Sequence, residues 1–247
     1  MKRILTGFLV FITLNAFCQK DKYPAGSYYL YNTQWKSVTK PEEAAYFAHR
    51  LQESDTGWKW DVYNYAGPLI ASLHFKDKDL SQLHGTQYYY HATGYLDSSG
   101  DVTNGKQHGD WGFFNDSGVL YLKKVYDNGI LVSSEGPKEN TADTSTSKDE
   151  HESMFTGGTG QWKKYISKNL QYPERAQNLK IEGLVITDFI VDAAGNVSHV
   201  TIFKSTEFSI DEETIRLIKN SPKWQPAWQR GRHVKSYKRQ PLVYKLQ

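Results

Sequence analysis

Residues 184–203 read LVITDFIVDAAGNVSHVTIF, and this stretch decides the fold of the C-terminal part of the chain. Residues 184–191 and 197–203 are rich in β-branched and aromatic side chains, which is typical of strands. Between them, Asp192, Gly195 and Asn196 are residue types that favour turns. The sequence therefore predicts an antiparallel hairpin here.

Helices are predicted on both sides of this hairpin. Residues 161–170 carry apolar side chains at helical spacing, and Tyr172-Pro173 ends that helix and opens a second helical turn. After the hairpin, residues 209–218 again show helical spacing, and Ser209 with Glu212 has the pattern of a capping box. This alternation of helices and strands predicts an α+β domain from residue 154 to 247.

The last strand candidate covers residues 234–246 and contains Pro241. A proline cannot donate a ladder hydrogen bond, so it belongs at a sheet edge or a bulge. We therefore expect this strand to lie at a sheet edge or to carry a bulge at Pro241.

A repeat of 24 residues (109 − 85) runs through residues 55–132. It relates Gly85 to Gly109 and Asn104-Gly105 to Asn128-Gly129, and an earlier, worn copy lies around Trp60. Asn-Gly is a strong signal for a tight hairpin turn because both residues tolerate positive φ. The repeats, which include residues 109–114 (GDWGFF), resemble MORN-like β-hairpin repeats, so an N-terminal antiparallel hairpin region is predicted.

Two further segments complete the predicted organisation. Ala44, Phe47, Ala48 and Leu51 fall at helical spacing, so a short amphipathic helix is expected over residues 40–51, within a unit of residues 19–132. Residues 133–153 are polar and lack large apolar side chains, so they are interpreted as a linker.

The N-terminus has the features of a secretory signal peptide over residues 1–18. Lys2 and Arg3 precede a short apolar run, and cleavage is expected after Cys18. Lipidation of Cys18 and an uncleaved anchor are the alternatives. The expected location is the periplasm, with membrane attachment in either alternative case.

Composition and motifs argue against several function classes. The 30 Lys and Arg balance 27 Asp and Glu, unlike a nucleic-acid-binding chain, and an aromatic content of 14% favours antiparallel sheets. The single cysteine excludes a disulfide. Because no catalytic or phosphate-binding motif occurs, we expect no enzyme activity, no cofactor and no metal. Trp58, Trp60 and Trp111 are weighed as sugar-stacking residues for peptidoglycan, against packing on each other.

The C-terminal part resembles the C-terminal domain of TonB energy transducers. The resemblance rests on a series of short motifs that occur in order, and it covers residues 154–247. The motifs are Phe155-Thr156-Gly157-Gly158, Tyr172-Pro173, Gly183-x-Val185, Phe189-x-Val191-Asp192, Gly195-x-Val197, Trp224-x-Pro226-Ala227, Gly231 and Val234.

This resemblance implies both a fold and a partner. The fold would be two to three helices packed on a three-stranded antiparallel sheet. The partner would be the TonB box, an extended peptide of an outer-membrane receptor, which adds as a strand to the exposed last strand during transmembrane transport. The partner-binding residues it nominates are Tyr172, Pro173, Arg175, Tyr237, Lys238, Arg239, Leu242 and Tyr244.

Structural roles remain the alternative for these residues. Tyr172-Pro173 would then only orient a helix, and Leu242 would only be part of the core. The chain also departs from an energy transducer, which normally has an uncleaved transmembrane helix and a long Pro/Lys/Glu-rich span. The rival hypothesis is a structural envelope protein that uses the TonB-like fold for homodimerisation or peptidoglycan attachment. An unpaired last strand would favour receptor binding over this rival.

Overall fold

The computed structural model describes residues 27–55, 57–136 and 150–246. The predicted signal peptide and cleavage site lie outside these residues. The first part of the chain forms β1 (Tyr28–Tyr31), β2 (Ser37–Val38), a 3-10 helix η1 (Pro41–Glu43), β3 (Tyr46–Gln52), β4 (Trp58–Asn64), β5 (Leu69–Phe75), β6 (Gly85–Tyr90), β7 (Leu96–Thr103), β8 (Lys106–Phe114), β9 (Leu120–Asp127) and β10 (Ile130–Glu135).

The second part contains the helices. Its elements are β11 (Met154–Phe155), α1 (Gly158–Asn169), α2 (Glu174–Asn178), β12 (Gly183–Val191), β13 (Val197–Lys204), α3 (Phe208–Lys219), β14 (Trp224–Gln225), β15 (Ala227–Gln229), β16 (Arg232–Val234) and β17 (Ser236–Tyr244).

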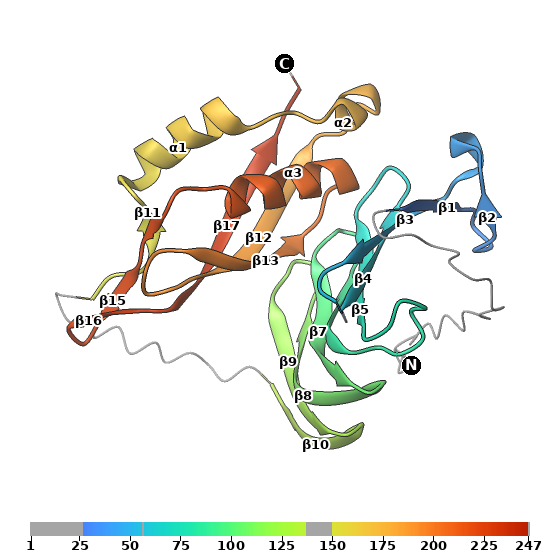
Figure 1. The fold of residues 1–247 in the computed structure, drawn as a ribbon, viewed down its shortest axis with the longest axis horizontal. Coiled ribbons are helices and arrows are strands. Elements are labelled where there is room, and N and C mark those ends of the chain that lie inside the picture. The colour runs from blue at the N-terminus through green and yellow to red at the C-terminus, as the bar shows by residue number, and fades with distance from the viewer. Residues whose placement is uncertain (1–26, 56, 137–149, 247) are drawn as a thin grey trace, which may run out of the picture.

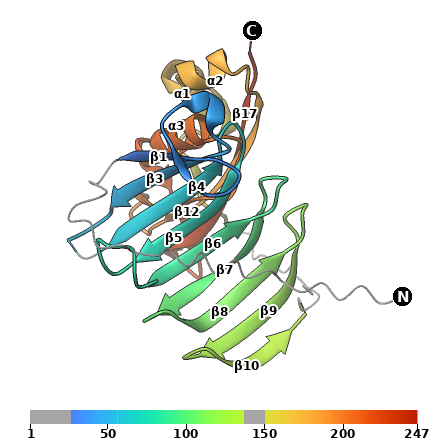
Figure 2. The ribbon, with the colours of Figure 1, turned by 90° about the vertical axis from the view of Figure 1, so that its right-hand side faces the viewer.

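The N-terminal strands form one antiparallel sheet in the order β10-β9-β8-β7-β6-β5-β4-β3-β1-β2. Figure 2 shows these strands as one twisted sheet with β10 at its edge. From β3 to β10 every strand pairs with its neighbour in sequence, as the repeats predict. Asn104 and Asn128 have φ of 50° and 49°, and each is followed by a glycine with positive φ, so both Asn-Gly pairs form the expected tight turns.

The repeat has a clear structural meaning. The bounds of β7, shifted by one period, are those of β9, and β6 shifted in the same way falls within β8. Trp111 lies opposite Gly100 in the β7–β8 ladder, and a Cβ on Gly100 would come within 2.3 Å of the Trp111 ring. The glycine thus leaves room for the tryptophan. The MORN-like assignment itself stays a prediction.

The helix expected over residues 40–51 is wrong. Only the single 3-10 turn η1 forms, and residues 46–52 form strand β3 between β1 and β4. Phe47 and Ala48 are both buried, on opposite faces of the sheet, in two different core clusters. A short apolar run can fit both helical and strand spacing, so its local pattern does not decide between them. Here, pairing with strands on both sides and burial on both faces favour the strand.

The C-terminal domain has the predicted α+β form. Its sheet has three antiparallel strands in the order β13-β12-β17, and Figure 1 shows α1, α2 and α3 on one side of it. The predicted capping box is displaced: the N-cap of α3 is Glu207, whose side chain accepts a hydrogen bond from the Ser209 backbone N–H at 2.8 Å. Ser209 is therefore inside the helix.

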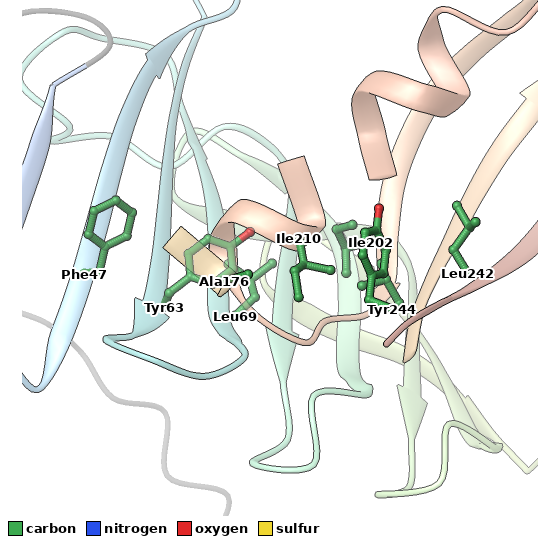
Figure 3. Packing of buried hydrophobic residues seen from close by; sticks show 9 residues of the cluster. Phe47, Tyr63, Leu69, Ala176, Ile202, Ile210, Leu242 and Tyr244 are labelled. Carbon is green, nitrogen blue, oxygen red and sulfur yellow. The ribbon is translucent and has the colours of Figure 1, made fainter. Parts of the chain in front are cut away.

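A single hydrophobic cluster joins the two sheets. Phe47, Tyr63 and Leu69 come from the N-terminal sheet, and they share this cluster with side chains of the C-terminal domain. Figure 3 shows Tyr63 and Leu69 beside Ile210 of α3. The domain side contributes Ala176, Val185, Ile202, Ile210, Leu242 and Tyr244. The two parts therefore share buried apolar surface and stabilise each other.

Structure also extends into both ends of the predicted linker. Strand β10 continues to Glu135, and His151 forms an isolated bridge with Trp228. In the described part of the chain, no helix combines the length and apolar character that crossing a membrane requires.

Candidate partner-binding edge

Strand β17 lies at one edge of the three-stranded sheet. Among the described residues it pairs only with β12, over nine residue pairs from Gly183↔Tyr244 to Val191↔Ser236. The other edge strand, β13, is partly occupied, because Lys204 at its end forms a bridge with Tyr95 of the N-terminal part. The open edge of β17 is thus the longer stretch of available backbone.

Side chains of β17 alternate between the core and solvent. Leu242 and Tyr244 are buried against the helices. Tyr237 and Val243 are 76% and 60% exposed on the other face. Strand periodicity requires this separation, because successive side chains point to opposite faces.

The backbone of β17 alternates in the same way between β12 and the open edge. The Gln240 carbonyl accepts a hydrogen bond from the Thr187 hydroxyl of β12 at 3.3 Å. The next residue, Pro241, has no N–H, yet the ladder passes it without a register shift. Both observations direct the backbone of the odd-numbered residues, including Tyr237 and Val243, to the open edge.

Two basic side chains of β17 are held by acidic neighbours. Arg239 lies directly opposite Asp188 and donates two hydrogen bonds to its carboxylate, each of 2.7 Å. The guanidinium carbon of Arg239 also lies 3.2 Å from the centre of the Phe203 ring. Lys238 forms an ion pair with Glu152 at 3.3 Å. Arg239 therefore extends across β12 towards β13, whereas Lys238 extends towards the segment before β11.

Tyr172 and Pro173 hold the start of α2. The Tyr172 hydroxyl donates to the Ile181 carbonyl at 2.5 Å, and its ring packs edge-on against Tyr244 at 5.7 Å. Burial and the nearby Glu182 raise the pKa of Tyr172. Pro173 is the N-cap of α2. A contact of either residue with a partner stays a prediction.

Arg175 lies at the junction of the two parts of the chain. Its Nε donates to Glu207 at 2.6 Å, and its Nη2 donates to the Tyr65 carbonyl. The guanidinium also lies over the rings of Phe47 and Tyr65, at 5.3 and 4.9 Å. The nominated residues therefore do not form one continuous site: Tyr237, Lys238 and Arg239 line the edge, whereas Arg175 contacts the N-terminal sheet.

Sequence reasoning missed several residues at these places. Val243 follows the same parity as Tyr237, so strand alternation could have identified it. Asp211 is fully buried beside the junction: it accepts hydrogen bonds from the Ser205 hydroxyl at 2.5 Å and the Thr206 N–H at 3.0 Å. Its desolvation by burial raises its pKa to about 8. No local pattern indicates this burial, because the contacts come from distant segments.

The tryptophan residues weighed for sugar stacking are covered by other parts of the protein. Trp60 and Trp111 are buried, so neither indole face is available to a sugar ring, and Trp58 has the Arg50 guanidinium 4.2 Å from its ring centre. In residues 27–55, 57–136 and 150–246, no cluster of three or more His, Cys, Asp or Glu is suited to a metal ion.

Comparison with models of protein families gives a match for the C-terminal domain. Residues 168–246 match the model for the Gram-negative bacterial TonB protein C-terminal region. This part of the chain is a TonB-like domain. The match includes α2, the whole three-stranded sheet and the edge strand β17.

Solved structures similar to the chain include two solution NMR structures of the C-terminal domain of Helicobacter pylori TonB. The first is 24% identical and covers 34% of this chain and 77% of that one, with a TM-score of 0.27. The second is 25% identical and covers 35% of this chain and 90% of that one, also with a TM-score of 0.27. No curated protein sequence matches the chain.

Proposed function

We propose that the protein is a periplasmic TonB-related adaptor that captures an extended segment of an outer-membrane receptor. The segment, of the TonB-box type, adds as a strand to the open edge of β17. The observation that carries this proposal is the unshared edge itself: β17 pairs only with β12 among the described residues, within a TonB-like domain. The role is binding in transmembrane transport and requires no enzyme activity.

The backbone at this edge suits strand addition. Tyr237, Arg239 and Val243 direct N–H and C=O groups outward, whereas Pro241 offers only a carbonyl. An incoming strand would gain main-chain hydrogen bonds on both sides of Pro241. The exposed rings and aliphatic groups of Tyr237 and Val243 would then contact alternate side chains of the incoming strand.

Lys238 and Arg239 contribute to selectivity at the same edge. Positive charge on an edge strand disfavours pairing with unrelated strands. From residue 220 to 247 the chain has seven Lys or Arg and no Asp or Glu. Two of the seven, Lys238 and Arg239, are offset by Glu152 and Asp188, and the excess of the others favours a partner segment that is not itself basic.

The test is peptide binding by the whole chain, because the shared core gives no ground for assuming that the TonB-like domain folds alone. Peptides with the sequences of extended receptor N-termini would be titrated into isotope-labelled protein, and amide shifts followed by NMR. We expect saturable shifts along residues 235–246.

A pair of variants makes the test specific for main-chain pairing. Val243→Pro removes one outward N–H at an exposed position, whereas Val243→Thr keeps it. Binding should weaken about tenfold or more in the first variant, which is the equivalent of one good hydrogen bond, and stay close to wild type in the second. Equal binding by both variants, or no shifts in the wild type, would overturn the proposal and favour a structural envelope role.

A further inference from the structure

The hairpin array ends on an incomplete unit. Strands β6 and β7 form one unit, and one period later β8 and β9 form the next. Strand β10 begins one period after β8, at Ile130, so it is the first strand of a third unit. In the earlier units the first strand pairs with a second strand: β6 pairs with β7, and β8 pairs with β9. Among the described residues, no second strand of this kind pairs with β10.

The sequence of β10 is apolar where its equivalent is polar. One period earlier, β8 begins Lys106-Gln107-His108, whereas β10 begins Ile130-Leu131-Val132. Ile130 and Val132 are 72% and 64% exposed, and Leu131 is also exposed. Terminal units of a repeat array normally need a polar outer face for solubility. The exposed apolar run is the opposite of that pattern.

Strand β10 has few of the features that protect sheet edges, and its one charged residue is Glu135 at its end. It has no lysine, arginine or proline, in contrast to β17. It does contain a bulge against β9, between Leu131 and Ser133. However, β8 has a similar shift one residue further along, where Gly109 and Asp110 are skipped in its ladder with β7, and both residues still pair with β9 on the other side. A bulge here is therefore compatible with pairing on the open edge.

We propose that β10 pairs with β10 of a second copy of this chain. All neighbours in the array are antiparallel. Two copies related by a two-fold axis present their edge strands antiparallel to each other. Strand β10 of one copy can therefore take the place of the missing strand beside β10 of the other. The exposed aliphatic residues of the two copies would cover each other, and the sheets would join into one.

The oligomeric state tests this pairing. The chain, recovered from the envelope of an expressing host, would be studied by sedimentation over a range of concentrations. We expect the wild type to approach the mass of two chains, and Val132→Lys to raise the dissociation constant by about tenfold or more, since a charge at the joined edge opposes pairing. The matched control is Val243→Lys, a similarly exposed valine on β17, which should pair like the wild type.

Single-cysteine variants give a second measurement. In a Cys18→Ser background, cysteine would be placed in turn at Leu131, Val132 and Ser133. Residues at the two-fold axis of an antiparallel pair lie within the range that a disulfide spans, so one of the three should cross-link on mild oxidation. Cysteine at Val243 is the control. A wild type that stays at the mass of one chain, a Val132→Lys variant that still pairs, or the absence of a cross-link at all three positions would overturn the proposal.

Discussion

Arg175 of α2 and Glu207, the N-cap of α3, form an ion pair at 2.6 Å in which the glutamate has no exposed surface. The same guanidinium reaches the Tyr65 carbonyl of the N-terminal sheet. One side chain thus connects two helices of the TonB-like domain with the loop after β4. Arg175 thus joins the N-terminal sheet to the TonB-like domain, and its replacement should lower the stability of the whole chain.

Replacement of Arg175 by alanine should destabilise the protein by about 3 kcal/mol, because it leaves the buried Glu207 carboxylate without its cationic partner. Urea unfolding of the full chain measures this. Lys163→Ala, at an exposed position of α1, is the control and should change stability by less than about 0.5 kcal/mol. A similar small change in Arg175→Ala would contradict the structural role.

Asp211 should make the stability depend on pH. Burial raises its folded pKa from 3.8 to about 8, so the folded state binds this proton more tightly than the unfolded chain does. The resulting stabilisation is complete below the unfolded pKa and is lost as the pH rises through the folded pKa. Asp211→Asn, which cannot ionise, should therefore lose less stability than the wild type as the pH is raised from 3.8 to about 8.

Denaturant midpoints measured across this pH range show the difference. Glu174→Gln, at an exposed position of α2, is the control and should follow the pH profile of the wild type. Parallel pH profiles for the wild type and Asp211→Asn would show that Asp211 is not the responsible group.

Gly100 and Gly160 should respond to the same substitution with opposite signs. A Cβ at Gly100 would overlap the Trp111 ring, so Gly100→Ala should cost about 1 to 3 kcal/mol. A Cβ at Gly160, in α1, meets nothing within 4 Å, so Gly160→Ala should stabilise by up to about 1 kcal/mol through helix propensity. Thermal unfolding compares the two, and equal shifts would count against the packing of Trp111 on Gly100.

The Asp188–Arg239 pair should contribute modestly. Both side chains are partly exposed, so a double-mutant cycle with alanine at each position should give a coupling of about 0.5 to 1 kcal/mol. The coupling should fall in high salt, since screening weakens exposed pairs. A coupling that does not respond to salt would contradict the description of this contact as an exposed ion pair.

Part of the candidate site follows directly from local sequence. Pro241 indicates an edge or a bulge, and the alternation through residues 236–244 could have separated Leu242 and Tyr244 from Tyr237 and Val243, although all the nominated residues of this strand were first grouped together. Arg175 could not be interpreted in this way. Its contacts are with Tyr65 and Phe47, more than a hundred residues earlier, and with Glu207, on another helix, and a motif of neighbouring residues carries no information about them.

The sequence by itself determined the local elements: the hairpin around Gly195, the Asn-Gly turns, the 24-residue period and the edge or bulge at Pro241 of the last strand. These depend on backbone preferences and on short-range alternation, which are written in adjacent residues. Tertiary structure alone decided that residues 46–52 are a strand, that Asp211 is buried and that the two sheets share a core. In those cases the deciding free energy comes from burial and pairing between distant segments, which outweigh local propensity.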